Sequence, residues 1–179
     1  MVEQCRKTGA TFGIVSLVQG AEVRRPGAPV EAFNPVGTLA RITHFEAPQP
    51  GLMEIDCIGT DRFRVANSQQ LANGLWMADV ELLDEDVPTP IPDDLKHTST
   101  TLGQLIQSLR EQHVAENRFP ILAPLQLDDC AWVANRWCEV LPLPLSLKHN
   151  LMALESPLVR LELVADVLAK AHSANQRPE

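Results

Sequence analysis

The sequence predicts an α+β protein in which a small, strongly twisted β-barrel precedes a bundle of helices. In the first half of the chain, apolar residues alternate with polar ones, which is the period of a half-buried strand. In the second half, apolar residues recur at intervals of three and four, which is the period of a helix. Between the halves, residues 84–92 combine acidic residues with prolines, and this composition supports neither a strand nor a helix.

This change of composition predicts the domain limits. Of the 179 residues, 45% are hydrophobic, so the chain can bury a core as one domain or as two small ones. We expect a β-rich domain over residues 1–86, a proline-rich linker over residues 87–97, a helical bundle over residues 98–172 and a flexible tail over residues 173–179.

Residues 37–65 predict two adjacent strands joined by a connection rich in proline and glycine. After this connection, apolar residues alternate with acidic ones, so that one face of the strand is apolar. These apolar residues are Met53, Ile55 and Cys57. Gly59 interrupts the alternation where a bulge or a close backbone approach is expected, and the strand resumes with Phe63 and Val65 on one face.

Two further strands flank this pair. The run from Phe12 to Val18 is apolar and β-rich, and it is limited by Gly20. Residues 76–82 form the other strand, because apolar residues alternate with Met77 and acidic residues along it. The residues expected on its inner face are Trp76, Ala78, Val80 and Leu82.

The second half predicts a series of helices. The first has its apolar face at Leu102, Leu105, Ile106 and Leu109, and its capping candidates are Thr98, Ser99 and Thr101. Asp128 or Asp129 is expected to cap the second helix, which stops near Pro142. Ser146 is expected to cap the third. A fourth begins at Ser156 and Pro157, with Leu158, Leu161, Ala165 and Leu168 facing inward.

Charge and motifs exclude several function classes. The net charge of −8 argues against a surface that follows nucleic-acid phosphates. The sequence contains no glycine-rich phosphate loop, no His-Glu-x-x-His and no Gly-x-Ser-x-Gly. Its cysteines lack the spacing of a zinc site and the density of a secreted disulfide framework, and no long apolar run or signal peptide is present. We therefore expect a cytoplasmic protein with no catalytic residues, no cofactor and no metal.

Four segments, in the order of one known family, point to its identity. Gly37–Ile42 (GTLARI) and Gly59–Arg64 (GTDRFR) resemble the paired motifs of the substrate-binding, N-terminal domain of Lon protease and of the free-standing bacterial proteins made of that domain alone. Gly9–Val15 (GATFGIV) resembles an upstream motif of the family, and Leu154–Leu161 (LESPLVRL) resembles the start of its final helix.

The resemblance implies a PUA-like barrel and the recognition of polypeptide substrates, without the ATPase and protease modules of full-length Lon. The function expected is non-catalytic binding of unfolded or degradation-marked segments. The alternative is a PUA-like RNA or nucleotide-binding module, which the net charge of −8 disfavours. Expected partners are a polypeptide client, a separate protease or chaperone, and a second copy of the chain as a homodimer. Neither a membrane nor nucleic acid is expected.

Candidate peptide-binding residues are apolar side chains that are rare in this chain or that lie in a connection. Tryptophan in a groove is an efficient anchor for an extended peptide, although a core position competes with this interpretation. The connection over residues 117–126 is unusually apolar, so it either packs onto the barrel or offers a binding surface. The candidates are Trp76, Trp132, Phe119, Ile121 and Leu122.

The N-terminus departs from the family pattern. Relatives begin with a Pro-Leu-Phe-Pro-like strand followed by a helix, whereas Met1–Cys5 resembles the interior of that helix. We therefore expect the first strand to be missing and strand edges to be exposed. The interpretations are a different biological start, cover by a second copy, or a peptide groove filled by strand addition. We favour the first as the origin, with dimerisation or edge pairing as its consequence.

Overall fold

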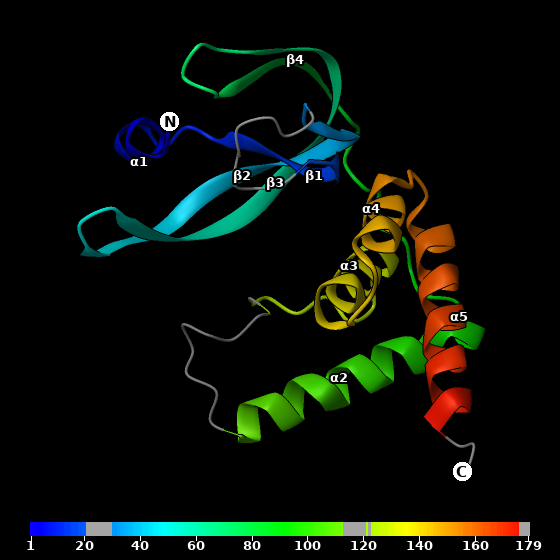
Figure 1. The fold of residues 1–179 in the computed structure, drawn as a ribbon. Coiled ribbons are helices and arrows are strands. Elements are labelled where there is room, and N and C mark those ends of the chain that lie inside the picture. The colour runs from blue at the N-terminus through cyan, green and yellow to red at the C-terminus, as the bar shows by residue number, and fades with distance from the viewer. Residues whose placement is uncertain (21–29, 113–120, 122, 176–179) are drawn as a thin grey trace. The chain divides into compact units, whose positions relative to one another are not determined.

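The chain divides into two compact units, Met1–Glu85 and Asp86–Glu179. The structure is a computed structural model, and it describes residues 1–20, 30–112, 121 and 123–175 (Figure 1). Of the elements in these described residues, the four strands and one short helix belong to the first unit, and the other helices belong to the second. The predicted α+β class is confirmed.

The first unit is built on a four-stranded antiparallel sheet with the strand order β1-β2-β3-β4. A short helix, α1 (Val2–Thr8), precedes it. The strands are β1 (Phe12–Gln19), β2 (Ala32–Gln49), β3 (Leu52–Gln70) and β4 (Trp76–Leu82). All four predicted strands are confirmed, but the central pair is longer than residues 37–65 because β2 begins earlier and β3 ends later.

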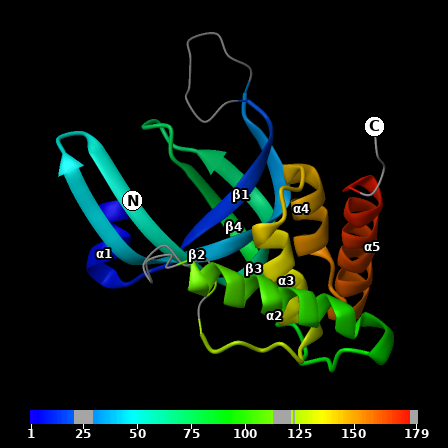
Figure 2. The ribbon, with the colours of Figure 1, turned by 90° about the horizontal axis from the view of Figure 1, so that it is seen from below.

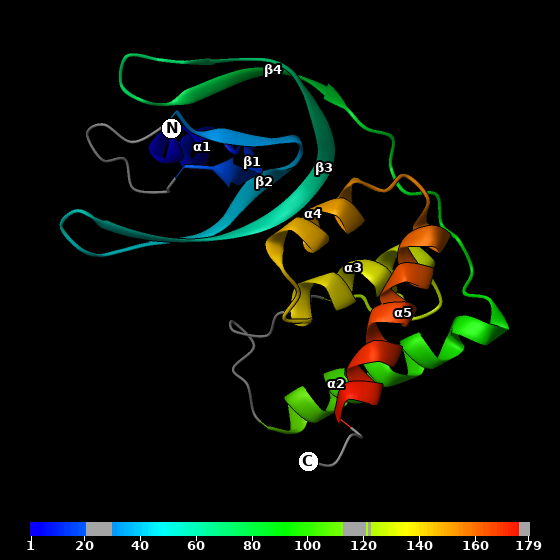
Figure 3. The ribbon, with the colours of Figure 1, turned by 45° about the vertical axis from the view of Figure 1, so that its right-hand side comes forward.

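The sheet is strongly curved. The strands β2 and β3 bend along their length, and β4 curls back over the sheet (Figure 3). Phe33 of β2 and Trp76 of β4 therefore form an edge-to-face pair with ring centroids 5.2 Å apart, although their strands are not neighbours in the sheet. The expected bulge is present, since Ala40 pairs with Gly59 but Thr38 pairs with Arg62, leaving an extra residue in β3.

The helix α1 lies beside the long β2–β3 hairpin (Figure 2). The guanidinium of Arg6 stands 4.7 Å from the centre of the Phe45 ring of β2, which is the geometry of a cation–π contact. Cys5, on the same helix, is buried. The cation–π contact thus attaches this helix to the sheet.

The packing of Phe63 explains why two motifs, GATFGIV and GTLARI, contain glycine at Gly13 and Gly37. Its ring is 2% exposed, and it occupies the space above Gly13 and Gly37. A Cβ atom added to Gly37 would lie 2.6 Å from Cζ of Phe63 and 2.5 Å from the carbonyl oxygen of Ile14. These distances are too short for any side chain, so the motif glycine is needed for close packing.

Replacing Gly37 by alanine is therefore expected to lower the free energy of unfolding by about 1 to 3 kcal/mol, because a backbone oxygen has to move. The matched control is Gly59→Ala, where the only close atom is Cγ2 of Thr38 at 3.2 Å, in a side chain that can adjust. Urea denaturation of both variants tests this. A loss at Gly59 that equals or exceeds the loss at Gly37 contradicts the packing argument.

The second unit contains a 3₁₀ turn and four helices within the described residues. They are η1 (Asp93–Leu95), α2 (Lys96–Glu111), α3 (Cys130–Val140), α4 (Leu145–Ala153) and α5 (Pro157–Asn175). Side chains from all of them form one apolar core, whose most buried members include Leu102, Ile106, Val133, Leu151, Leu161 and Val164. No helix in the described ranges is long and apolar enough to cross a membrane.

Two of the predicted helix starts are confirmed. The Asp129 carboxylate caps α3 by accepting a hydrogen bond from the Trp132 amide at 2.8 Å. At the start of α5, the hydroxyl oxygen of Ser156 accepts one from the Val159 amide at 3.4 Å. The choice between Asp128 and Asp129 is thus settled in favour of Asp129.

The other predicted caps are wrong. The helix α2 begins at Lys96, directly after η1, so Thr98, Ser99 and Thr101 lie inside it. Their hydroxyls donate hydrogen bonds to backbone carbonyls instead, as Thr98 does to Leu95 at 2.7 Å. Ser146 also lies inside its helix, because α4 begins at Leu145 after Pro144.

Residues 87–97, expected to form a linker, make hydrogen bonds to the second unit. The Thr89 amide donates to the Asp129 carboxylate at 2.9 Å, and the Cys130 amide donates to the Thr89 carbonyl at 2.8 Å. The Ile91 amide donates to the Asp128 carbonyl at 3.2 Å, and the Ile91 side chain joins the core. This segment is therefore fixed along the start of α3.

Arg160 of α5 is the one buried charged residue among those described, at 1% exposure. Its guanidinium donates two hydrogen bonds to the Asp86 carboxylate, at 2.6 and 3.1 Å. It also donates to the Asn135 side chain and to the carbonyls of Leu151 and Leu154. The donors of this buried cation are thereby satisfied, and the first residue of the second unit is fixed to its last helix.

Candidate functional site

The first unit contains an open cavity of about 950 Å³ on the inner side of the curved sheet. All four strands and α1 contribute to its wall, and most of the wall is apolar. The main apolar residues are Met1, Phe12, Val15, Leu17, Phe33, Leu39, Phe63, Val65, Trp76, Met77 and Val80. A cavity of this size and character can accommodate apolar side chains of a ligand.

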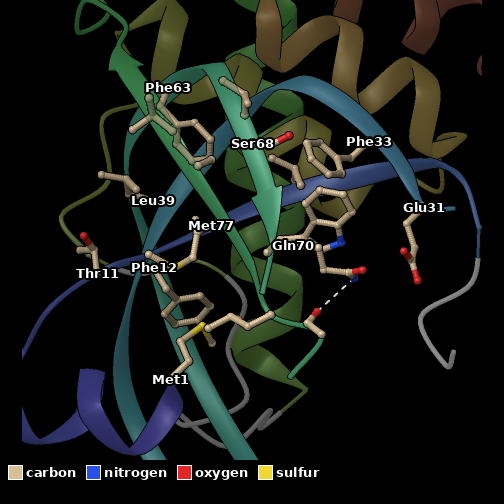
Figure 4. A pocket seen from close by; sticks show the side chains of 18 of the residues that line it. Met1, Thr11, Phe12, Glu31, Phe33, Leu39, Phe63, Ser68, Gln70 and Met77 are labelled. Atoms are coloured by element: carbon tan, nitrogen blue, oxygen red, sulfur yellow. Dashed lines mark hydrogen bonds between the residues drawn. The ribbon is translucent and has the colours of Figure 1, made fainter. Parts of the chain in front are cut away.

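The two ends of the cavity differ in polarity (Figure 4). Met1, Phe12 and Met77 gather at one end, where two flexible thioethers meet an aromatic ring. Glu31 and Gln70 lie at the other, and the Gln70 side chain donates a hydrogen bond to the Gly74 carbonyl at 3.2 Å. The cavity thus offers an adaptable apolar end and a polar end.

Glu31 is the only charged side chain among the described residues that line the cavity. Among the lining residues that the structure describes, no lysine or arginine side chain joins it there. Electrostatically, the cavity favours neutral or basic ligands over anionic ones.

The structure separates the sequence-predicted site residues. Trp76 lines the cavity in the first unit. Trp132 belongs to α3 in the second unit, half-buried against the helical core, with the Arg136 guanidinium 5.8 Å from its ring centre. Ile121 is 2% exposed and part of that same core, so its side chain is not on a surface. Phe119 and Leu122 lie outside the described residues.

The lining residues that sequence analysis missed come from segments far apart in the chain. Phe33, Leu39 and Met77 meet in the cavity because the sheet is curved, and no local pattern encodes that curvature. One sequence pattern did indicate part of the cavity wall. Gly13, Val15 and Leu17 alternate along β1 as Trp76, Ala78 and Val80 do along β4, and both sets face the cavity.

The cysteines and other titratable groups suggest no chemistry. All four cysteines are free. Burial, the largest cause, raises the pKa of the thiols of Cys130 and Cys138, which keeps them in the less reactive protonated form. In the part of the chain that the structure describes, no three histidine, cysteine or acidic side chains gather as metal ligands would.

An apolar cavity of this kind is typical of a binding domain, and comparison with known proteins agrees. The family model of the ATP-dependent protease La (LON) substrate-binding domain matches residues 1–170. The chain therefore belongs to this family, as the motif resemblance indicated.

Two solved structures are similar to this chain. The structure of a Lon N-terminal domain protein from Xanthomonas campestris is 26% identical, with a TM-score of 0.66, and the match covers 92% of this chain and 80% of that one. The N-terminal domain of a Mycobacterium avium complex Lon protease is 14% identical, with a TM-score of 0.49, over 88% and 89% of the two chains. No curated protein matches significantly in sequence.

Proposed function

We propose that this chain is a non-catalytic polypeptide-binding protein that recognises unfolded or degradation-marked segments through the cavity of its curved sheet. The observation that supports this most directly is the open apolar cavity of about 950 Å³, in a chain that belongs to a substrate-binding family. Trp76 and Met77 are the proposed contact residues, since both line the cavity and Met77 is 49% exposed. The client is a polypeptide, with a separate protease or chaperone as a further partner.

Finer features of the fold belong to the same proposal. The bent sheet is consistent with an incomplete PUA-like barrel, and the shared apolar core of α2 to α5 is consistent with a helical bundle. Four free cysteines favour a reducing compartment, and therefore the cytoplasm.

The test is binding of a permanently unfolded protein, reduced, alkylated and fluorescently labelled, followed by anisotropy. We expect saturable binding that Met77→Glu weakens at least tenfold, because the variant places a carboxylate on the apolar wall. The matched control is Ile14→Glu, also in an edge strand, since Ile14 is 50% exposed but does not line the cavity. Circular dichroism verifies that both variants fold.

The proposal fails if the wild-type chain does not bind the unfolded protein, or if both glutamate variants weaken binding equally. Single-stranded RNA serves as the competing ligand. Binding of RNA that falls steeply between about 50 and 200 mM salt would favour the nucleic-acid alternative, because the release of counterions from phosphates depends strongly on salt.

A further inference from the structure

The geometry points to strand addition as the binding mode of this cavity, with an extended segment of alternating apolar and basic residues pairing along the outer edge of β4. This inference rests on the proposed function, because it specifies how the polypeptide binds and which polypeptide is preferred. It has three supports, namely the position of the strand edges, the regularity of β4 and the distribution of charge around the cavity.

The cavity lies between the two edges of the sheet. Within the described residues, β1 pairs only with β2, and β4 pairs only with β3. Met77 and Ala78 are adjacent in β4, so their side chains point to opposite faces, yet both line the cavity. The cavity therefore reaches around the edge of β4, where every second residue directs its backbone N–H and C=O away from β3.

The edge of β4 is the better template of the two. The pairing of β1 is irregular at two places within eight residues, between Val15 and Leu17 and between Leu17 and Gln19. Irregular pairing twists an edge away from further partners. In contrast, the pairing of β4 has a single register shift, between Val65 and Asn67 of β3, and it is regular from Trp76 to Asp79. A strand of seven residues accommodates a segment of about six to eight residues at roughly 3.3 Å per residue.

The two faces of an added strand would meet different surroundings. Side chains on its inner face would lie in the apolar cavity beside Ala78 and Val80. Those on its outer face would lie next to Asp79, which is exposed and pairs across the sheet with the uncharged Asn67. Asp79 has no ion-pair partner among the described residues, so a lysine or arginine beside it would supply one.

The charge at the polar end of the cavity also favours a basic segment. Glu31 carries the only charged side chain among the lining residues in the described part of the chain, and it is acidic. Glu81, also in β4, contributes less because Arg64 of β3 lies directly across from it. Asp79 and Glu31 together therefore favour a segment with basic residues, and the apolar wall requires that these alternate with apolar ones.

The first experiment uses an eight-residue peptide in which valine and lysine alternate, titrated into the chain and followed by anisotropy. Two further peptides carry N-methyl groups on one or the other set of alternate residues, which removes the N–H donors from one edge only. We expect one methylated peptide to bind at least tenfold more weakly and the other to bind nearly as well as the parent. If the two lose affinity equally, or neither does, strand addition is wrong while polypeptide binding stands.

The second experiment tests the charge preference. Asp79→Lys is expected to weaken the valine–lysine peptide about tenfold and to strengthen a valine–glutamate peptide. The control is Glu155→Lys, which makes the same change of charge at an exposed position of the second unit. If the Asp79→Lys variant keeps the preference for the valine–lysine peptide, the proposed preference for basic residues is wrong. If neither these peptides nor the unfolded protein binds, the proposed function itself has failed, and the two failures are thereby distinguished.

Discussion

Replacing Arg160 by methionine is expected to lower the free energy of unfolding of the helical unit by about 3 to 5 kcal/mol. The substitution removes the guanidinium that donates to Asp86, Asn135 and the carbonyls of Leu151 and Leu154. The Asp86 side chain is only 16% exposed, so its charge would remain largely buried after losing the Arg160 guanidinium. The cost arises mainly from the loss of the buried ion pair to that carboxylate and of the hydrogen bonds to the two carbonyls.

Urea denaturation measures this loss, followed by the fluorescence of Trp132 and Trp137 in a Trp76→Phe background so that the signal reports on the second unit. The double variant Arg160→Met with Asp86→Leu is expected to recover part of the loss, because it also removes the largely buried carboxylate that has lost the guanidinium. The control is Lys96→Met, which breaks the exposed Lys96–Asp93 pair and is expected to leave the midpoint unchanged. An Arg160 variant as stable as that control would contradict the buried-pair account.

The secondary structure was largely predictable because its signals are local. Alternation along residues 12–18 and 76–82 identifies strands that the structure contains as β1 and β4. The Asp129 cap and the Ser156-Pro157 start also follow from local chemistry. The wrong caps show the limit of that reasoning. A hydroxyl inside a helix bonds a carbonyl one turn earlier as readily as it caps, so its residue type alone does not decide.

The candidate site was less predictable because it depends on the curvature of the sheet. Trp76 was identified through its rarity and its alternation, and it lines the cavity. Met77, its neighbour, belongs to the opposite face by simple alternation, and only the exposed edge of β4 brings it to the cavity. Ile121 shows the converse, since an apolar residue in a connection is buried in the helical core.

The second large effect is expected at Phe63, where replacement by alanine should cost about 3 to 5 kcal/mol of unfolding free energy. The ring is 2% exposed, and it fills the space that Gly13 and Gly37 leave open. Neither glycine has a side chain that could collapse into the resulting void, so relaxation is limited and the loss should lie within the usual range for a buried phenylalanine.

Native-state hydrogen exchange, read separately for peptides from the sheet and from the helices, is the appropriate measurement because the chain has two compact units. We expect faster exchange of the amides in β2 and β3, with little change in α3 and α5. The matched control is Ile14→Ala, since Ile14 is an apolar residue of the same sheet that is 50% exposed. A loss at Phe63 below about 1 kcal/mol would show that its ring does not hold the sheet together. If the sheet of the Phe63→Ala variant stays folded, its cavity is larger by the volume of the missing ring, and we expect it to bind bulkier apolar side chains.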